Sequence, residues 1–422
     1  MSVNAFSNIT KENTGLDIAS DLPLFDKRDT ISQRIKNDVR EYSIFSKYTQ
    51  RTKNHILNLN TGYLWQKSQF YPPDQKNILP DFRQNYFYTG IYAEKREGFL
   101  QYRAGINIRK HDNSFKSSQT KGKWLFLPSI SSKFSFSSTH HLSLKYTRQA
   151  GFPRANQLNI FGYANSFRDF QSISEVQSDK TIMNNQFNLT YFYFNLFSGT
   201  QILLNSFYNK TKNSIGRNSS ISGNYNYFSL INSPYRNNWT TTMQFQTRMN
   251  PVKTIFKIEA SYIYSKFENY VDFDRNKAIV RDYQVRPLLS SLFKNSWLNY
   301  EIGVEVHQNN TKFMSPEAVN KGTITSPFIN FNGVFAKNWR YFVNHNFSYY
   351  RTSNTNRNTN KLDIEIRYRQ ESSKLSYWLS GENIFNLTSS QIAEVSTTEN
   401  SMSQNIIYQM PGYIGVGVSY DF

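Results

Sequence analysis

Short segments in which apolar and polar residues alternate one by one recur along most of this chain. In the segment 361–369, Leu, Ile, Ile and Tyr occupy every second position, and Asp, Glu, Arg and Arg stand between them. The last ten residues, 413–422, alternate in the same way. A period of two is that of an extended strand with two unlike faces. Such a strand suits a membrane, with lipid on one side and a lumen on the other.

The connections between these segments alternate in length. Read back from the C-terminus, the short links are 371–373, 337–338, 294–296, 250–252, 197–199, 138–140, 95–97 and 51–53. The long links between them are 388–411, 353–360, 310–324, 268–278, 212–237, 150–182, 111–123 and 68–83. Periplasmic turns and extracellular loops of outer-membrane barrels alternate in this order, whereas a soluble sandwich has no reason to keep it.

Composition narrows the class further. The hydrophobic content of 38% and the mean hydropathy of −0.63 exclude a helical membrane bundle. No run reaches the roughly 18 apolar residues that a spanning helix needs. The aromatic content of 16%, with 29 Tyr and 34 Phe, is too high for a disordered polar chain. A membrane barrel with a wet lumen, a thin apolar band and aromatic girdles would account for both the low hydrophobic content and the high aromatic content.

We therefore predict an all-β fold, a transmembrane antiparallel up-and-down β-barrel with about 16–18 strands present. Residues 38–422 are expected to form the barrel domain, and residues 1–37 to be loop or a remnant of upstream barrel. About 16 strands from residue 54 and one at 38–50 give an odd count, whereas bacterial single-chain barrels use even numbers. The N-terminus also lacks the pattern of a signal peptide. Either a leader has been removed or this is part of a longer chain. The odd strand count predicts that barrel strands are missing upstream.

Two stretches resemble the outer-membrane barrels of TonB-dependent receptors of the Bacteroidota type. The first is Tyr-Thr-Gly-Ile-Tyr-Ala-Glu-Lys at 88–95, followed by Tyr-Arg-Ala-Gly-Ile-Asn-Ile-Arg at 102–109. The second runs from Leu-Pro-Ser-Ile-Ser at 127–131 through His-Leu-Ser-Leu-Lys-Tyr-Thr-Arg at 141–148 to 152–159. Near the end, Ser-Gly-Glu-Asn-Ile-Phe-Asn at 380–386 is similar to that family's turn before the last loop.

The chain also departs from the family pattern. Phe152 stands where an Arg is usual, and Ile160 replaces the second Pro before Phe161. The Gly-Asn-Pro segment expected next is absent from 162–182. The resemblance covers roughly 84–161 and 374–422, and it does not identify a substrate.

The resemblance implies a barrel of about 22 strands, of which this chain would be the C-terminal portion, with a plug in the lumen. The implied function is energised, TonB-dependent uptake of a scarce nutrient such as a chelate, an oligosaccharide or a peptide. It implies the cell outer membrane as the location. The implied partners are outer-membrane lipid and lipopolysaccharide, the barrel-assembly machinery, and a surface lipoprotein. TonB would act only through a plug domain, and this chain contains nothing similar to one.

Two other functions stay open. A stand-alone porin-like channel would have the same wall and admit solutes by diffusion. A soluble β-rich adhesin would need strands that ignore the alternation of short and long links. Genomic sequence upstream of Met1 separates the first two, and solubility without detergent tests the third.

The net charge of +19 indicates acidic partners. The basic residues are scattered between aromatic strands rather than gathered on a helix, so phosphates of lipopolysaccharide suit them better than nucleic acid. Absence of Cys excludes disulfides and cysteine nucleophiles. His140 and His141 lack a nearby Glu in metalloprotease spacing. We expect no enzymatic activity, no cofactor and no metal site.

Charged residues between the apolar positions of three strands are candidates for the lumen. They are Lys257, Glu259, Glu301, Glu305, His307, Asp363, Glu365, Arg367 and Arg369. These residues could hold a plug or guide a charged solute, but ordinary cross-strand ion pairs in a wet lumen would look the same. Glu305 and His307 could share a cation, although two ligands do not make a site. His345 falls on the apolar face.

Tyr and Arg in two long links are candidates for ligand contacts, because loops vary on a rigid scaffold. They are Arg154, Phe161, Tyr163, Arg168, Arg217, Tyr225, Tyr227, Tyr235 and Arg236. Packing of the loops on each other would explain the same residues. The closing strand resembles the C-terminal insertion signal of outer-membrane barrels, which assigns that role to Val418, Tyr420 and Phe422.

Overall fold

The computed structural model describes most of the chain. The described residues are 2–18, 31–71, 81–115, 118–158, 161–164, 169–223, 225–291, 293, 296–314, 317–352, 356–370, 373–386, 390–397, 402–409 and 411–420. Side chains are described from residue 36 onward, except at 118–121, 164, 386, 390–397 and 402–409.

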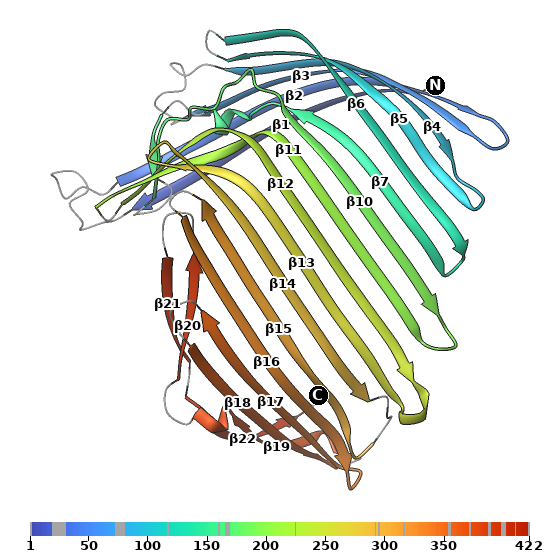
Figure 1. The fold of residues 1–422 in the computed structure, drawn as a ribbon, viewed down its shortest axis with the longest axis vertical. Helices are drawn as coiled ribbons and strands as arrows, with labels where there is room; N and C mark the ends of the chain where they lie inside the picture. Colours follow the sequence, from blue (N-terminus) through green and yellow to red (C-terminus); the bar gives the residue numbers. More distant parts are fainter. Residues whose placement is uncertain are drawn as a thin grey trace.

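One large antiparallel sheet dominates the fold (Figure 1). In the described part of the chain, eighteen strands follow one another up and down, each paired with the next in the series. The series begins with β1 to β7, continues directly with β10 to β19 and ends with β22. Figure 1 shows this series from the blue strands at the top to the red strands at the bottom. The predicted all-β, antiparallel up-and-down architecture with 16–18 strands is confirmed.

The strands vary in length from 8 to 25 residues. Their bounds are β1 (Ser2–Ile18), β2 (Ile31–Arg51), β3 (Ile56–Tyr71), β4 (Phe82–Lys95), β5 (Leu100–Phe115), β6 (Ser118–Ser137), β7 (His140–Gly151), β10 (Ile182–Asn195), β11 (Thr200–Ser222), β12 (Tyr225–Met249), β13 (Thr254–Val271), β14 (Asp274–Ser291), β15 (Asn299–Met314), β16 (Glu317–Phe335), β17 (Trp339–Thr352), β18 (Asn356–Arg369), β19 (Leu375–Glu382) and β22 (Tyr413–Tyr420). A separate two-stranded sheet, β20 (Ser390–Thr397) with β21 (Met402–Gln409), lies in the link before β22.

The N-terminal region differs from the prediction of a loop. Residues 2–18 form β1, which pairs with β2 from Ser2 opposite Lys47 to Ile18 opposite Ile31. β2 in turn begins at residue 31 rather than 38. The odd count of 17 strands was therefore wrong, and the parity argument for strands missing upstream no longer holds. Within 1–37, the residues that the structure describes, 2–18 and 31–37, belong to β1 and β2.

Several predicted long loops are also strands. Residues within 111–123, 212–237, 268–278 and 310–324 extend the neighbouring hairpins, whose turns are short. Pairing across a hairpin gives each backbone N–H and C=O a partner, which an irregular loop of the same length would lack. The alternation of short and long links thus reflects strands that project farther at one end of the sheet than at the other.

A long link, 152–181, connects β7 to β10 and passes over the ends of several strands. It contains the short strands β8 (Tyr163–Ala164) and β9 (Asp169–Gln171) and the 3-10 turn η2 (Ala155–Gln157). Two buried hydrophobic clusters lie beneath it. One is formed by Phe82, Ala155, Leu158 and Val176, and the other by Leu125, Leu127 and Phe152. The only helices in the described residues are short turns, and none has the length and hydrophobicity to cross a membrane.

Candidate functional site on the polar face of the sheet

The strand register sorts the side chains of the sheet onto two unlike faces. We call the face that carries Val306 and Val416 the apolar face. The opposite face, with Glu259, Glu301 and Asp363, is the polar face. Residues paired across strands lie on the same face, so the assignment carries from each strand to the next. The two-residue period of the sequence predicted this separation.

Large hydrophobic side chains of the apolar face are exposed. Val416 is 77% exposed, Phe126 is 56% exposed and Ile91 is 53% exposed. His345 shares this face, as predicted, and its Nε2 lies 2.7 Å from Oδ1 of Asn360. Contiguous apolar surface of this kind indicates contact with another apolar medium or partner.

The polar face carries a charged row across β13, β14 and β15. Arg286 lies opposite Glu259, with 3.4 Å between Nη1 and Oε2. Its Nη2 is 3.6 Å from Oε1 of Glu301 on the next strand. Gln284 Nε2 donates to Oε1 of Glu305 at 2.9 Å. All of these side chains are partly exposed, so their ion pairs contribute little to the stability of the fold. Their main effect is to hold the charged side chains in fixed positions on the polar face.

Glu305 and His307, which lie two residues apart on the polar face, each have a side-chain partner on β14. His307 Nε2 lies 2.8 Å from Oδ2 of Asp282, and Asn309 donates to the same oxygen at 3.2 Å. Glu305 is engaged by Gln284. Within the described side chains there is no group of three or more His, Asp and Glu that could hold a metal ion.

The four charged residues of β18 also lie on the polar face, as predicted. Arg367 bonds Glu365 through Nη2 at 2.6 Å, and Lys361 pairs with Asp363 at 2.9 Å. Asp363 additionally accepts the backbone N–H of Asn383 at 2.8 Å. The sequence suggested ordinary cross-strand ion pairs, as Arg286 makes with Glu259, whereas these two pairs of β18 each lie within one strand.

Sequence reasoning missed Arg286 and Asp282, the two central partners in the charged row. Both lie in a segment, 279–293, that the alternation identified only as a strand. Their partners depend on the register between strands, in which Arg286 comes opposite Glu259 and Gln284 opposite His307. Alternation fixes the face of a residue but does not fix its neighbour on the next strand.

Segment 152–181 closes over one end of the polar face. Phe152, which is 8% exposed, stacks on His111 of β5 with 4.0 Å between ring centroids. His111 stacks in turn on Tyr86 of β4 at 5.7 Å. Asn113 Nδ2 donates to the carbonyl of Ser178 at 2.7 Å. Beyond it, Glu175 N donates to the carbonyl of Leu230 in β12, so the segment bridges distant strands.

Two of the ligand candidates predicted in this segment, Phe161 and Tyr163, contact other protein side chains. Phe161 stacks on Phe70 of β3 at 5.5 Å between centroids. Tyr163 donates its hydroxyl to Oε1 of Gln171 at 2.6 Å. The side chain of Arg154 is exposed at the start of η2. Arg168 lies outside the described residues.

The other five ligand candidates are in strands rather than in a loop, which corrects their prediction. Arg217 lies in β11, and its guanidinium sits 3.9 Å from the ring centroid of Phe228. Tyr225 and Tyr227, in β12, contact Phe170 of β9. Tyr235 and Arg236 are adjacent residues of β12 and thus point to opposite faces of the sheet. These residues do not form one binding surface.

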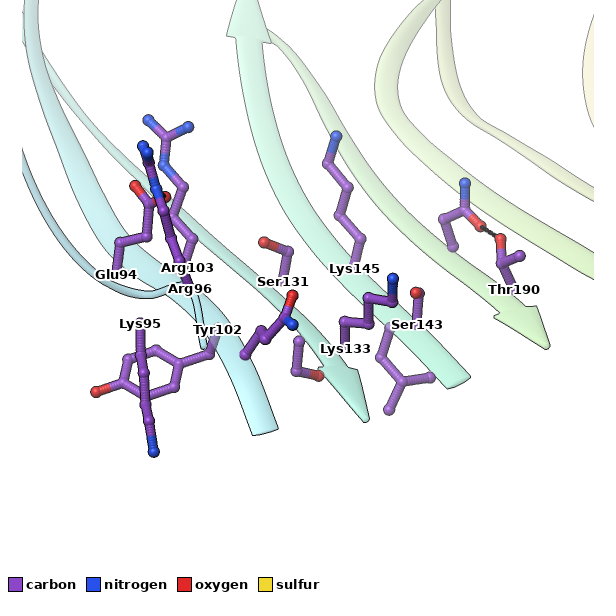
Figure 2. A pocket seen from close by; sticks show the side chains of 14 residues that line it. Glu94, Lys95, Arg96, Tyr102, Arg103, Ser131, Lys133, Ser143, Lys145 and Thr190 are labelled. Carbon is purple, nitrogen blue, oxygen red and sulfur yellow. Dashed lines mark hydrogen bonds and ion pairs between the residues drawn. The ribbon is translucent and has the colours of Figure 1, made fainter. Parts of the chain in front are cut away.

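A basic hollow that was not predicted lies on the polar face at the other end of β4 to β10 (Figure 2). Its volume is about 640 Å³. Arg103, Lys133 and Lys145 come from neighbouring strands, and Glu94 is the single carboxylate among the lining residues. Strand register again explains the omission, because these cations are far apart in sequence. The arrangement can hold an anionic group.

The closing strand keeps its predicted faces. Val418 and Tyr420 lie on the apolar face and are 60% and 50% exposed. Phe422, the third residue of the expected insertion signal, lies outside the described residues. On the polar face, Gly415 and Gly417 lie against the indole of Trp378.

His111 leads to a prediction about pH. On β5 the apolar side of the strand ends at Ile108 and continues with Lys110, so His111 lies beyond the apolar part. Burial, and secondly the charge of Arg109, lowers the pKa of His111 from 6.5 to about 4. Between these values His111 gains a proton when segment 152–181 is released, but stays neutral while Phe152 covers it, so the stability of the closed segment falls as pH falls.

The expected loss of unfolding free energy is at most about 1.4 kcal/mol per pH unit. Protease cleavage within 152–181, measured between pH 7 and pH 4.5, should become faster toward acid in the wild type. His111→Phe keeps the ring stack and removes the titration, so its pH dependence should be flatter. Equal slopes in both proteins would exclude His111 as the titrating group.

Comparisons with known proteins give matches at the level of structure. No protein-family model matches the chain, and no curated protein matches it in sequence. Two variants of the FrpB iron transporter from Neisseria meningitidis, F3-3 and F5-1, are similar at 12% and 10% identity, with TM-scores of 0.47 and 0.46. Both matches cover 100% of this chain, which spans 60% and 61% of the length of those proteins. The copper transporter OprC is similar at 7% identity and a TM-score of 0.40, with 99% of this chain and 70% of OprC covered.

Proposed function

We propose that this chain forms wall and outer loops of a β-barrel in the cell outer membrane. The observation that carries the proposal is the exposed apolar face opposite a charged polar face, across an antiparallel sheet of eighteen strands. In water, an apolar surface of this extent would drive association, whereas in a bilayer it meets hydrocarbon. A soluble β-rich adhesin would have no use for it.

An aromatic row on the apolar face supports the same proposal. It crosses neighbouring strands in register and consists of Tyr146, Phe187, Tyr208, Trp239 and Tyr264. The rings of Tyr146 and Phe187 lie 4.6 Å apart, and Trp239 is half-exposed. Rings arranged in this way form the girdle by which membrane barrels sit at the edge of the bilayer.

Within that class, we assign the chain to a TonB-dependent receptor of the Bacteroidota type that takes up a scarce nutrient. The segments 88–95, 102–109, 127–131 and 141–148 support this, since they resemble that family and lie on adjacent strands β4 to β7. A barrel of about 22 strands with a plug would have further strands beside β1 or β22. TonB would act through that plug. Barrel-assembly machinery, outer-membrane lipid and a surface lipoprotein are the other proposed partners.

Val416→Arg tests the membrane location. Near the bilayer midplane an Arg on the lipid side costs about 2–4 kcal/mol, whereas in water a residue as exposed as Val416 tolerates it. The variant should therefore fold into lipid vesicles in lower yield, as measured by heat-modifiable electrophoretic mobility. Asn344→Arg, an exposed position on the polar face, is the control and should fold as the wild type does.

Equal folding of Val416→Arg and the wild type in vesicles would contradict the membrane proposal, as would a chain that stays soluble without detergent. The receptor assignment has a separate test in the adjoining genomic sequence. A plug-coding stretch in frame or adjacent supports a receptor. A signal peptide directly upstream without a plug supports a porin-like diffusion channel instead.

A further inference from the structure

A row of cations crosses the apolar face beside the aromatic row. It runs over seven neighbouring strands, β7 and β10 to β15 (Figure 1). In strand order the row consists of Arg148, Asn185, Lys210, Asn237, Lys266, Ile279 and Lys312. A cation thus occupies every second strand. Neighbouring strands are about 4.8 Å apart, so successive cations are roughly 10 Å apart along the row.

The two rows have a fixed order along the strands. Three of the four cations stand two residues beyond an aromatic of the same strand: Arg148 beyond Tyr146, Lys210 beyond Tyr208 and Lys266 beyond Tyr264. On β15 the residue two positions before Lys312 is Asn310. Two residues of a strand cover about 7 Å. If the aromatic row marks the edge of the hydrocarbon, the cation row lies at the depth of the lipid headgroups.

The cations occur at only one end of these seven strands. On their apolar face, the described Lys and Arg all lie at the end next to segment 152–181. They are Arg148, Lys210, Lys212, Lys266, Arg275, Lys277, Arg281 and Lys312, and Arg275 is paired with Glu268 of the neighbouring strand. At the opposite end the same face carries Thr200, Thr247 and Phe256. A general need for solubility would not distribute charge so unequally, whereas a membrane with one phosphate-rich leaflet would.

We propose that the cation row binds the phosphate groups of an anionic glycolipid in the outer leaflet, of the lipopolysaccharide type. A headgroup with two phosphates can bridge successive cations of the row while its acyl chains contact the apolar face below. The Asn side chains between the cations supply donors for the headgroup oxygens. The inference rests on the proposed membrane location and adds the lipid class and the orientation of the barrel in the membrane.

The contacts of the row leave room for such a ligand. Lys266 Nζ lies 5.8 Å from the ring centroid of Tyr235, a contact that leaves its ammonium donors available. Lys312 pairs with Glu317 at 2.8 Å, but both side chains are largely exposed, so the pair is weak. Beside Lys312, a hollow of about 200 Å³ is lined by Arg281, Lys321 and Asn310. This hollow at the end of the row gathers three cations around one headgroup-sized space.

The test compares two triple variants of the refolded protein in detergent. The first, Arg148→Gln with Lys210→Gln and Lys266→Gln, removes three cations of the row. The control, Lys53→Gln with Lys337→Gln and Lys374→Gln, removes the same charge from exposed positions at or beside short turns at the other end. Binding of diphosphoryl lipid A, monophosphoryl lipid A and phosphatidylcholine is measured by intrinsic tryptophan fluorescence, at low and high salt.

The wild type and the control should bind diphosphoryl lipid A equally, more tightly than monophosphoryl lipid A, and least tightly at high salt. Each cation near an anionic lipid contributes about 1 kcal/mol, so the first variant should bind about 100-fold more weakly. Equal binding by wild type and first variant would overturn the proposal. An equal loss in the control would do the same, since it would show a response to net charge alone.

Two further measurements distinguish a failure of the lipid proposal from a failure of the membrane proposal. Displacement of the lipid by millimolar inorganic phosphate would show a site for free phosphate and would overturn the assignment to lipid. Heat-modifiable mobility of every variant reports the folded barrel independently of lipid binding. If all variants fold into vesicles yet none prefers lipid A, the lipid site fails while the membrane barrel stands.

Discussion

Replacing Phe152 with Ala is expected to release segment 152–181 from the polar face while leaving the barrel folded. Phe152 is buried and fills the space between His111, Leu125 and Leu127. Loss of a buried Phe typically costs about 3–5 kcal/mol, because the transfer energy and the ring contacts disappear and a cavity remains. A segment of this length, held by two small clusters, cannot absorb that cost without opening more often.

Limited proteolysis measures this release. Cleavage within 152–181 should be at least tenfold faster in Phe152→Ala, whereas heat-modifiable mobility should remain that of the wild type. Ile173→Ala is the matched control, because Ile173 lies in the same segment but is 56% exposed. Unchanged cleavage of Phe152→Ala, or equal acceleration in the control, would contradict the role of the stack.

A second large effect is expected at the closing strand, where Gly417 lies beneath Trp378. A Cβ at residue 417 would overlap the indole ring, so Gly417→Ala must displace Trp378 or separate β22 from β19. Overpacking of this kind costs about 1–3 kcal/mol. The substitution should lower the yield of the heat-modifiable form and the urea concentration at which the barrel unfolds.

Gly415 provides a matched control two residues away on the same face. A Cβ there would approach Trp378 no closer than 3.4 Å, which is ordinary contact, so Gly415→Ala should fold normally. The double variant Gly417→Ala with Trp378→Leu should recover the yield, because a smaller side chain removes the overlap. A destabilised Gly415→Ala, or the absence of rescue, would show that the strand tolerates no side chain for another reason.

The faces of the sheet could be predicted from the sequence because successive side chains of a strand point to opposite faces, with a period of two residues. Once 297–309 is a strand, Glu301, Glu305 and His307 must share a side opposite Ile302 and Val306. The structure places all five as expected. The same reasoning assigned Lys257 and Glu259, and the four charged residues of β18.

Contacts between strands could not be predicted, since a shift of register changes every partner and leaves the alternation intact. The pairs Arg286 with Glu259 and Asp282 with His307 appear only in the register. The basic hollow at Lys133 and the cation row were missed for this reason. Projecting strand ends such as 212–237 were mistaken for loops because polar residues there occupy both faces.

The hairpin of β11 and β12 is long enough to project far beyond the neighbouring part of the sheet. In the proposed membrane orientation Lys212 lies near the headgroup depth. From there β11 continues for ten more residues to Ser222, which is roughly 30 Å of extended chain. Its tip, with Tyr225 and Tyr227, therefore stands well clear of the lipid surface, on a support whose backbone is paired for almost its whole length. A bulky molecule arriving from outside can engage that tip without touching either the membrane or the charged wall.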